Sequence, residues 1–290
     1  MSDGEARAWP LSSLPRPRDV EEGTRRVRMG RLQQGRLLPA PDLVVCEEPL
    51  EIQVSGTPVA VVMRTPGHDR ELALGFVVTE RVVAEVDEVA AVHHGSVEAE
   101  AAGSENVVRV HLRAGIAPDL ERLRRNLFAS SSCGICGKAT LEQVLATAPP
   151  LDDPTQIDAG LFGTLPERLR RGQAVFDETG GLHAAALFSP EGTLRVLRED
   201  VGRHNAVDKV VGWALERERL PLSGHLLLVS GRISFEVAQK ALAARIPVVA
   251  AVSAPSSLAV ELAEEARMTL VGFLRGDGFN VYGARDRIRT

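Results

Sequence analysis

Short runs of alternating apolar and polar residues mark the first half of the chain beyond its start. From Asp42, the runs LVVCEEPLEIQVSG and TPVAVVMRT predict two strands that meet at a Ser-Gly-Thr-Pro turn. Apolar residues then recur at helical spacing over residues 72–77, and VVRVHLR (107–113) alternates as a strand does. A further helical segment is expected around residues 119–128. This mixture of strands and helices predicts an α+β domain.

The second half of the chain is more regular, because short apolar runs alternate with helical segments. The predicted strands cover residues 182–188, 193–199, 225–231, 247–254 and 269–274, and the predicted helices cover residues 204–217, 234–245 and 256–268. The first two strands are expected to form a hairpin. The later strands are short runs of mainly apolar residues, which is typical of strands buried on both faces, so the pattern predicts a three-layer α/β domain with at least partly parallel strands.

Two stretches divide the chain into candidate domains. Residues 1–38 are polar, rich in arginine and without periodicity, which predicts a mobile N-terminal tail. Residues 148–158 are rich in proline and aspartate and predict a domain boundary. The sequence therefore predicts a tail (1–38), an α+β domain (39–150) that ends in a Cys-x-x-Cys loop and its helix, and an α/β domain (151–290).

Composition and charge exclude several classes of protein. The chain has 290 residues, of which 44% are hydrophobic and 25% are charged, and this composition is typical of an ordinary globular protein. A net charge of −5 gives no general attraction to nucleic acid or to an acidic membrane. The N-terminus has prolines and acidic residues where a signal peptide needs an apolar run, and the longest apolar stretch, 246–260, is interrupted by proline and serine. We therefore expect a cytoplasmic protein that binds neither nucleic acid nor membrane.

Two of the three cysteines, Cys133 and Cys136, stand at CxxC spacing in a loop rich in glycine and serine, just before a predicted helix. Thiols beside a helix N-terminus and near Lys138 lie in positive potential, which lowers the pKa of a thiol and favours sulfur-transfer or redox chemistry. Zinc binding is the main alternative, although a structural site needs four ligands and the third cysteine, Cys46, lies alone in a strand pattern. Inert thiols are the remaining possibility, and the spacing alone leaves all three open.

Four turns in the second half follow predicted strands and carry groups that suit an anionic ligand. They lie at residues 199–205, 230–232, 253–257 and 273–278. In an open α/β sheet such turns gather at the carboxyl ends of the strands, where helix N-termini offer free N–H groups. Because Arg203, Arg232 and Arg275 recur in them, they predict a crevice for phosphate and a nucleobase, with Asp200 or Asp277 pairing with the base. The alternative is that serine and glycine there only cap helices.

One histidine and the few lysines stand out among the remaining polar residues. His204 opens a predicted helix whose polar face also carries Asn205, Asp208 and Lys209. This grouping suits a proton shuttle, a ligand-orienting role or a histidine that only forms hydrogen bonds. The only lysines among the 34 basic residues are Lys138, Lys209 and Lys240. A chain that otherwise uses arginine keeps lysine either by chance or where a compact charge is required.

Five sequence blocks follow one another along the chain, namely RTPGHDRELALGFVVTE, CGICGK, EDVGRHNAVDKVVG, SGRISFEVAQKA and GFLRGDGFNVY. Together they resemble the formate dehydrogenase accessory sulfurtransferase family, the FdhD sulfur carriers. The resemblance covers about residues 40–285 and is far more specific than a CxxC motif alone.

The resemblance implies a sulfurtransferase that accepts sulfur from a cysteine desulfurase as a persulfide on Cys133, with Cys136 as its partner. It implies transfer of that sulfur to the molybdenum bis(molybdopterin guanine dinucleotide) cofactor, Mo-bisMGD, before the cofactor enters formate dehydrogenase. It also implies a homodimer and a C-terminal half similar to the cytidine deaminase fold. By position in the motif, the residues expected to bind the cofactor are Phe273, Leu274, Arg275, Gly276, Asp277 and Gly278, joined from the crevice by Arg203, His204 and Arg232.

Two other functions stay open on the sequence alone. A zinc nucleobase deaminase would share the fold, but its signature needs H-x-E followed by P-C-x-x-C, and this sequence has no H-x-E. A non-catalytic escort that binds the cofactor or a guanine nucleotide without transferring sulfur is the stronger alternative. Replacing Cys133 separates the two, because an escort tolerates the change and a sulfur carrier does not. No metal site is predicted.

Overall fold

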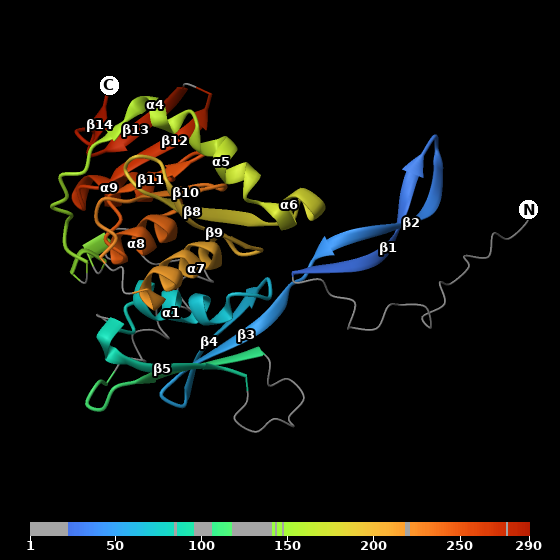
Figure 1. Cartoon of the computed structure of the whole chain (residues 1–290), viewed down its shortest axis with the longest axis horizontal. Helices are drawn as coiled ribbons and strands as arrows, with labels where there is room; N and C mark the ends of the chain where they lie inside the picture. Colours follow the sequence, from blue (N-terminus) through green and yellow to red (C-terminus); the bar gives the residue numbers. More distant parts are fainter. Residues whose placement is uncertain are drawn as a thin grey trace, which may run out of the picture.

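The computed structural model describes residues 23–83, 86–95, 106–117, 141–142, 144–146, 148–217, 221–276 and 278–290. Four of the residues singled out above, Cys133, Cys136, Lys138 and Asp277, lie outside this part of the chain, as does the helix expected around 119–128. The described residues form two β-sheets with helices between them, and a hairpin stands out from this body (Figure 1).

The larger sheet has six strands in the order β13-β12-β11-β10-β8-β9. Its strands are β8 (His183–Phe188), β9 (Leu194–Asp200), β10 (Leu226–Val229), β11 (Val248–Ala251), β12 (Thr269–Arg275) and β13 (Gly278–Gly283). The central strands β10, β11 and β12 are parallel, whereas β8 and β13 join them antiparallel. The predicted mixture of α and β structure with partly parallel strands is therefore confirmed.

Helices cover both faces of this sheet. Along β10, Leu227 and Val229 belong to the core shared with α7 (Arg203–Glu216), α8 (Phe235–Ala243) and α9 (Ser257–Glu265). The alternate residues of β10 pack toward α4 (Ala159–Phe162) and α5 (Leu165–Arg171), which α6 (Ala174–Thr179) follows. The C-terminus is fixed nearby, where β14 (Ile288–Arg289) pairs with β7 (Ile157–Asp158). No helix in the described part of the chain combines the length and apolarity that crossing a bilayer requires.

The smaller sheet comes from the first half of the chain and has the strand order β4-β3-β6-β5. Its elements are β3 (Glu48–Val54), β4 (Thr57–Arg64), α1 (Asp69–Thr79), the 3-10 turn η2 (Val86–Glu88), β5 (Val89–His94) and β6 (Val107–Leu112). Helix α1 lies on this sheet and packs against α7 of the second half (Figure 1). As a result, one continuous core of buried apolar residues runs from the small sheet to the large one.

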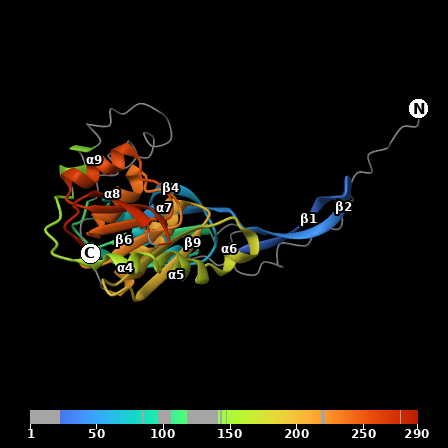
Figure 2. The same ribbon diagram turned by 90° about the horizontal axis from the view of Figure 1, so that it is seen from above.

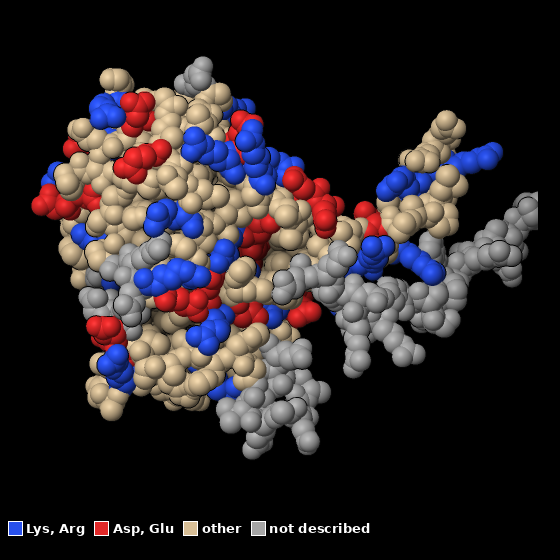
Figure 3. Space-filling view, in the orientation of Figure 1, with Lys and Arg blue, Asp and Glu red and all other residues tan. Residues whose placement is uncertain are grey.

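The hairpin corrects one sequence prediction. Residues 24–38 were expected to be part of a mobile tail, but β1 (Thr24–Gln33) and β2 (Arg36–Val45) form an antiparallel ribbon that points away from the body (Figures 1 and 2). Gln34 and Gly35, with φ of 50° and 75°, make the tight turn. Most of its side chains are exposed, and basic ones are visible on it in Figure 3. Neither face of the hairpin is buried, so its strands need no alternation of apolar and polar residues. The hydrophobicity pattern therefore does not predict them.

Two glycines allow α1 and α7 to cross in backbone contact. A Cβ atom added at Gly75 of α1 would lie 1.8 Å from the carbonyl oxygen of Asp208, and one added at Gly212 of α7 would lie 1.7 Å from that of Glu71. Neither position has a positive φ, so the glycines are required by the close approach of the helices and not by a turn. This crossing joins the two halves of the chain.

Buried ion pairs occupy the same region and explain two of the three lysines. Lys240 of α8 is 4% exposed, and its Nζ lies 2.9 Å from Oδ2 of Asp208 and 2.8 Å from Oε1 of Glu80. Lys209 of α7 is 1% exposed and lies 2.7 Å from Oδ2 of Asp200. An ammonium group has three donors at one compact centre, which suits several acceptors that converge on it from different elements.

Candidate functional site

One edge of the large sheet gathers the turns that the sequence singled out. Because β10, β11 and β12 are parallel, their carboxyl ends meet there, and the end of β9 joins them through its antiparallel pairing with β8. The helices α7, α8 and α9 begin at the same edge. Arg203, Arg232 and Arg275 are thereby brought to one side of the sheet, as are the turns that carry them. We call this side the carboxyl edge.

The helix N-termini at the carboxyl edge differ in how they are capped. At α9, the hydroxyl of Ser256 accepts a hydrogen bond from the amide of Ala259, so this turn is an ordinary cap. The N-cap residues of α7 and α8, Gly202 and Ser234, make no side-chain cap hydrogen bond. The first N–H groups of α7 therefore stay available to an anion, whereas at α8 the Glu236 carboxylate accepts hydrogen bonds from its own amide N–H and from the hydroxyl of Ser234.

Arg203 is the side chain best placed to bind an anion together with these N–H groups. Its Nε atom is buried and has no hydrogen-bond partner among the described residues. The guanidinium also forms no ion pair within the part of the chain that the structure describes, and it shares the start of α7 with the free N–H groups. A buried guanidinium nitrogen without an acceptor is costly unless a ligand supplies one, so the site fits a phosphate or pyrophosphate.

Asp200 positions this site and does not face a ligand, which corrects the suggestion that it pairs with a base. It is 0% exposed, and its carboxylate accepts hydrogen bonds from the amide N–H of Gly202 at 2.8 Å and from Nδ2 of Asn205 at 2.9 Å. It also pairs with Lys209, whose Nζ donates to the carbonyl of Thr65 in the loop between β4 and α1. The buried carboxylate thus fixes the first turn of α7 to the small sheet's side of the molecule.

The polar face predicted on α7 is not one cluster. His204 turns toward α8, where its Nε2 lies 3.3 Å from Oγ of Ser234 and 3.9 Å from Oε2 of Glu236. Asn205 and Lys209 turn to Asp200, and Asp208 turns to Lys240. The prediction is wrong in this respect because α7 is enclosed by several elements, and each polar side chain finds its partner on a different one.

Burial, reinforced by the charges of Arg203 and Lys240, lowers the pKa of His204 from 6.5 to about 4. The imidazole is therefore neutral at neutral pH and can accept a hydrogen bond or a proton. Since the unfolded chain binds this proton below about pH 6.5 and the folded chain does not until about pH 4, the stability contributed by the neutral ring is present above pH 6.5 and is lost as the pH falls toward 4.

We expect His204→Gln to remove this pH dependence. Between pH 7.5 and pH 4.5, the unfolding free energy of the wild type should fall by about 1–2 kcal/mol more than that of the variant. This difference is smaller than the full pKa shift would give, because the ring is partly exposed. Urea unfolding at the two pH values measures the change, with His225→Gln as the control. Parallel pH profiles for wild type and His204→Gln would contradict the assignment.

The stretch from Phe273 to Gly278 ends β12 and starts β13 with a bulge. Phe273 adopts φ 58°, and 45% of the residue is exposed at the carboxyl edge. A bulky residue in the left-handed region is strained, and such strain concentrates at functional sites. Its amide N–H donates to the carbonyl of Ser253, 3.0 Å away, which holds the bulge against the turn after β11.

The neighbours of Phe273 divide between surface and core. Arg275, Gly276 and Gly278 are exposed at the carboxyl edge, as is Arg232 after β10. Leu274 is 1% exposed and packs in the core beneath the sheet, so its side chain is placed for stability and not for ligand contact. The cofactor-binding role expected of this stretch stays a prediction, and Asp277 lies outside the described residues.

His183 belongs to the same edge and was missed by the sequence analysis. It is the first residue of β8 and pairs directly with Asp200 of β9. A Cβ on Gly231 would lie 3.5 Å from its Nδ1, so the ring lies over the turn that leads to Arg232. Burial first and then the charge of Arg203 lower the pKa of His183. Only the strand register reveals this proximity, because His183 is far from the arginine turns along the chain.

The surroundings of the CxxC motif are described only on its C-terminal side. Leu141, Val144 and Leu145 pack on the main core, and the amide of Leu151 donates to the carbonyl of Ala266 at the end of α9. This flank is therefore fixed at the edge of the sheet opposite the carboxyl edge. The third thiol, Cys46, is 5% exposed, and burial raises its pKa, which makes it a poor nucleophile. Within the described ranges, no group of three or more His, Cys, Asp or Glu could hold a metal ion.

Comparison with known proteins gives concordant results. A model of the FdhD/NarQ family matches residues 45–289. A Mycolicibacterium paratuberculosis protein named sulfur carrier protein FdhD is 53% identical over 91% of this chain and 98% of its own length. A Streptomyces avermitilis protein of the same name is 54% identical over 91% and 95%, respectively. The crystal structure of a candidate formate dehydrogenase accessory protein from Desulfotalea psychrophila has a TM-score of 0.72, covers 92% of this chain and 100% of its own, and is 21% identical, so it shows likeness of fold.

Proposed function

This chain belongs to the FdhD/NarQ family, and from that membership we propose that it is a sulfur carrier for the maturation of formate dehydrogenase. In this proposal Cys133 accepts sulfur from a cysteine desulfurase as a persulfide, and the sulfur is passed to Mo-bisMGD, which is the substrate of the second step. The two relatives described above, which are more than half identical to this chain, are named sulfur carrier proteins. Its proposed partners are the cysteine desulfurase and formate dehydrogenase. Its proposed oligomeric state is a homodimer.

The loading step follows from thiol chemistry. The Cys133 thiolate attacks the outer sulfur of the desulfurase persulfide, the sulfur–sulfur bond of the donor breaks, and the donor cysteine leaves as a thiolate. One persulfide is lost and one is formed, so no net oxidation occurs. An exposed thiol of low pKa is required, and the neighbouring Lys138 and the predicted helix after the motif would favour the anion.

The delivery step needs two electrons, because the carried sulfur must leave as sulfide. Attack by the Cys136 thiolate on the inner sulfur of the Cys133 persulfide supplies them, since it forms a Cys133–Cys136 disulfide and releases the outer sulfur as hydrosulfide. A thiol reductant then reopens the disulfide. If Cys136 instead only tunes its neighbour, the same two electrons must come from that reductant directly.

The observation that carries the binding part of the proposal is the unpartnered Nε of Arg203 at the free N-terminus of α7. Mo-bisMGD has pyrophosphate groups, and guanidinium groups beside helix N-termini are suited to them. Arg232, Arg275 and the exposed Phe273 lie along the same carboxyl edge and would contact the rest of the molecule. Cys133 and Cys136 lie outside the described residues, and the flank after them, Leu141 to Leu151, packs on the main core.

The test is intact mass spectrometry after incubation with a cysteine desulfurase and cysteine. We expect an adduct of one sulfur atom on the wild type and on Cys136→Ala, and none on Cys133→Ala, because only Cys133 accepts. The buried Cys46 provides the matched control, since Cys46→Ala should keep the adduct. An adduct that persists on Cys133→Ala, or zinc bound at one per chain in place of an adduct, would refute the carrier.

A complementation experiment in cells distinguishes a sulfur carrier from an escort that only binds the cofactor. In a strain that lacks the endogenous protein, the Cys133→Ala variant should leave formate dehydrogenase inactive if sulfur delivery is the function. Full formate dehydrogenase activity with this variant would instead favour an escort that only binds the cofactor at the carboxyl edge.

A further inference from the structure

The hairpin β1–β2 is built as a projecting arm. Its two ten-residue strands span about 30 Å and point away from the body (Figures 1 and 2). The base of the arm is fixed, because the amide of Cys46 donates to the carbonyl of Gly23 at 2.8 Å and Thr24 is only 3% exposed. A two-stranded hairpin has little stability of its own in water, so an arm of this length is expected to have a partner.

The surface of the arm is basic and has an apolar tip. Residues 24–45 include five arginines, all of them exposed, and a single acidic residue, Asp42, so the hairpin carries a charge of +4 although the whole chain carries −5. Basic side chains are visible along it in Figure 3. At the tip, Leu32 and Leu37 pair across the strands and are each 71% exposed. A partner of matching chemistry is acidic and supplies apolar contacts for the tip.

The arginines lie on both faces of the ribbon. Residues that pair across an antiparallel ribbon share a face. The register therefore places Arg26 and Arg28 on the face of the two tip leucines, and Arg25, Arg31 and Arg36 on the other face. A flat partner, such as a membrane or the face of a sheet, contacts only one of these sets. A strand added to the edge of the ribbon projects side chains to both faces, so the distribution favours an extended segment.

The edge of β1 is the one that suits an added strand. Strand β2 contains Pro39 and Pro41, which have no N–H to donate, whereas β1 contains no proline. These prolines face Gly30 and Arg28 in an unbroken register, so the four residues occupy positions whose backbone groups point away from the opposite strand. Along β1 those groups include the N–H donors. Within the described residues, β1 pairs with β2 alone.

A second copy of this chain is a poor partner for that edge. Two arms paired along β1 would bring the same arginines together, and like charges on neighbouring strands are destabilising. The edge strands of the two sheets, β4, β5, β9 and β13, offer no better match. Their only acidic residues are Glu199 and Asp200, which already accept hydrogen bonds from the amides of Phe176 and Gly202. The complementary segment is therefore expected on a different protein.

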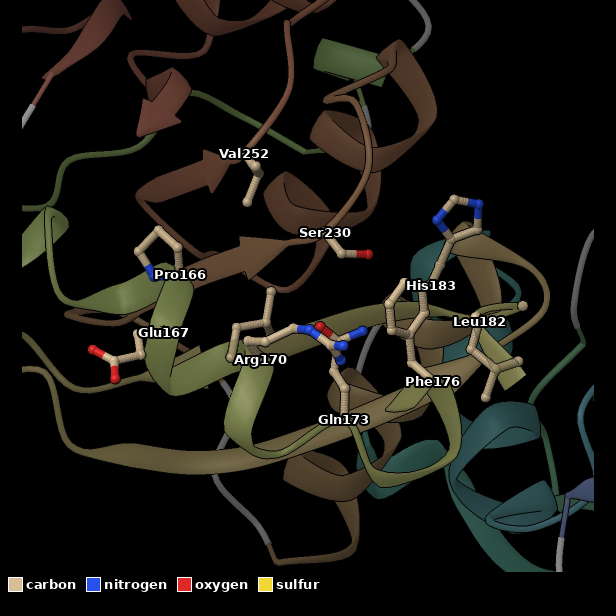
Figure 4. Close-up of a pocket in the computed structure, with 12 residues that line it drawn as sticks. Pro166, Glu167, Arg170, Gln173, Phe176, Leu182, His183, Ser230 and Val252 are labelled. Atoms are coloured by element: carbon tan, nitrogen blue, oxygen red, sulfur yellow. The ribbon is translucent and has the colours of Figure 1, made fainter. Parts of the chain in front are cut away.

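The base of the arm lies beside the carboxyl edge. A Cβ atom on Gly23 would lie 3.2 Å from Cγ2 of Thr65, whose hydroxyl accepts a hydrogen bond from the amide of Val201, just before α7. A Cβ atom on Gly181 would lie 3.0 Å from a side chain of β2. Gly181 follows α6, whose Phe176 lines a cavity at this edge (Figure 4). A protein held by the arm is thus next to the edge at which the cofactor is proposed to bind.

We propose that the arm docks the protein that receives the cofactor, by adding an acidic, extended segment of that protein to the edge of β1. The inference rests on the proposed function, because that function makes formate dehydrogenase the recipient. Carboxylates of the segment pair with arginines on both faces, and apolar residues at one end cover the tip at Leu32 and Leu37. The recipient is thereby held beside the carboxyl edge while the cofactor is handed over.

Fluorescence anisotropy with a synthetic ten-residue peptide tests the arm directly. The probe contains glutamate and threonine, with glutamate in both alternate sets of positions, and ends in two leucines. One control peptide has glutamine in place of glutamate, and another has methylated backbone amides. We expect the probe to bind at least about tenfold more tightly than either control, and its affinity to fall as salt is added.

The arm variant (Arg28→Glu, Arg31→Glu) reverses one charge on each face and should weaken the probe by at least about tenfold. The matched control (Arg113→Glu, Arg285→Glu) makes the same change of charge at exposed arginines outside the arm and should bind within about twofold of the wild type. Both variants should keep the thermal midpoint of the wild type, since all four side chains are exposed. Formate dehydrogenase purified without its cofactor should rank the variants in the same order.

Several outcomes would overturn the docking arm. Equal binding of the probe by wild type and arm variant would do so, as would equal binding of the glutamate and glutamine peptides. A methylated peptide as tight as the probe would show attraction of charges without strand addition. Binding of the wild type to phosphatidylglycerol vesicles but not to formate dehydrogenase would assign the arm to a lipid surface. Dissociation of a dimer in the arm variant during sedimentation would assign it to a contact between copies.

The sulfur adduct on Cys133 keeps this proposal distinct from the proposed function. The arm variant should form the adduct as the wild type does, because loading depends on the thiols. An adduct on a wild type that does not bind the probe refutes the arm and leaves the carrier intact. Binding of the probe without an adduct refutes the carrier and leaves the acidic strand as the ligand of the arm.

Discussion

Replacing Gly75 by valine is expected to leave no folded protein, and Gly75→Ala and Gly212→Ala should each lower the unfolding free energy by at least about 3 kcal/mol. The reason is that the new Cβ atoms would stand 1.8 and 1.7 Å from carbonyl oxygens of the facing helix. Backbone cannot rotate away as a side chain does, so relief requires α1 and α7 to separate. Their separation opens the core that both sheets share, and a loss of this size is a large part of ordinary protein stability.

Thermal unfolding followed by circular dichroism, with the yield of soluble protein, measures the effect. Gly278→Ala is the matched control, because its Cβ would have ordinary contact at 3.8 Å and open space elsewhere. A midpoint for Gly75→Ala within a degree or two of the wild type would show that the helices can move apart without cost. That outcome would contradict the close crossing.

The large sheet could be predicted from the sequence because its strands are buried on both faces. Runs such as LLLV and VVAA have no polar residue, and the helices between them have a clear apolar face, so hydrophobicity alone locates them. The hairpin β1–β2 is the opposite case. Its leucines at positions 32 and 37 are each 71% exposed, and backbone pairing without a buried face leaves no trace in the pattern.

The candidate site, too, could be predicted from the sequence only in part. The arginine turns could be found because each follows a strand, and parallel strands bring such turns to one edge. The direction of each side chain could not be found, since it depends on partners from other elements. Asp200 turned out to be a buried anchor, while His183 reaches the carboxyl edge only because the register of β8 pairs it with Asp200 of β9. The close crossing at Gly75 and Gly212 likewise has no signal in a single sequence.

Composition carried information that the pattern did not. A chain that uses arginine almost throughout kept lysine at positions 209 and 240, and both are buried among carboxylates and carbonyl groups. Arginine is too large and too rigid to replace a compact ammonium group on which several acceptors from different elements converge. The scarcity of lysine therefore marked two structural ion pairs at the junction of the two halves.

We expect Lys240→Met to cost about 3–5 kcal/mol of unfolding free energy at pH 8, because it leaves Asp208 buried with only the Thr79 hydroxyl, 2.7 Å away, among its side-chain partners. Asp208→Asn should cost less, since Lys240 keeps its contact with Glu80. The double variant should lose less than the sum of the two single losses, because the unpaired charge is then removed as well. Arg70→Met, which breaks the exposed pair with Glu216, should cost no more than about 1 kcal/mol.

The pH dependence separates a lost ion pair from lost packing. Burial raises the pKa of Asp208 to about 6 although Lys240 opposes this, so the pKa must rise further when the lysine is removed. A carboxyl whose pKa is higher in the folded state than in the unfolded one is stabilising when protonated and loses that contribution as the pH rises through the folded value. The deficit of Lys240→Met should therefore be smaller at pH 5 than at pH 8 in urea unfolding. A deficit equal at both pH values would assign the loss to the missing aliphatic contacts of Lys240, and the buried pair would then contribute little to joining the two halves of the chain.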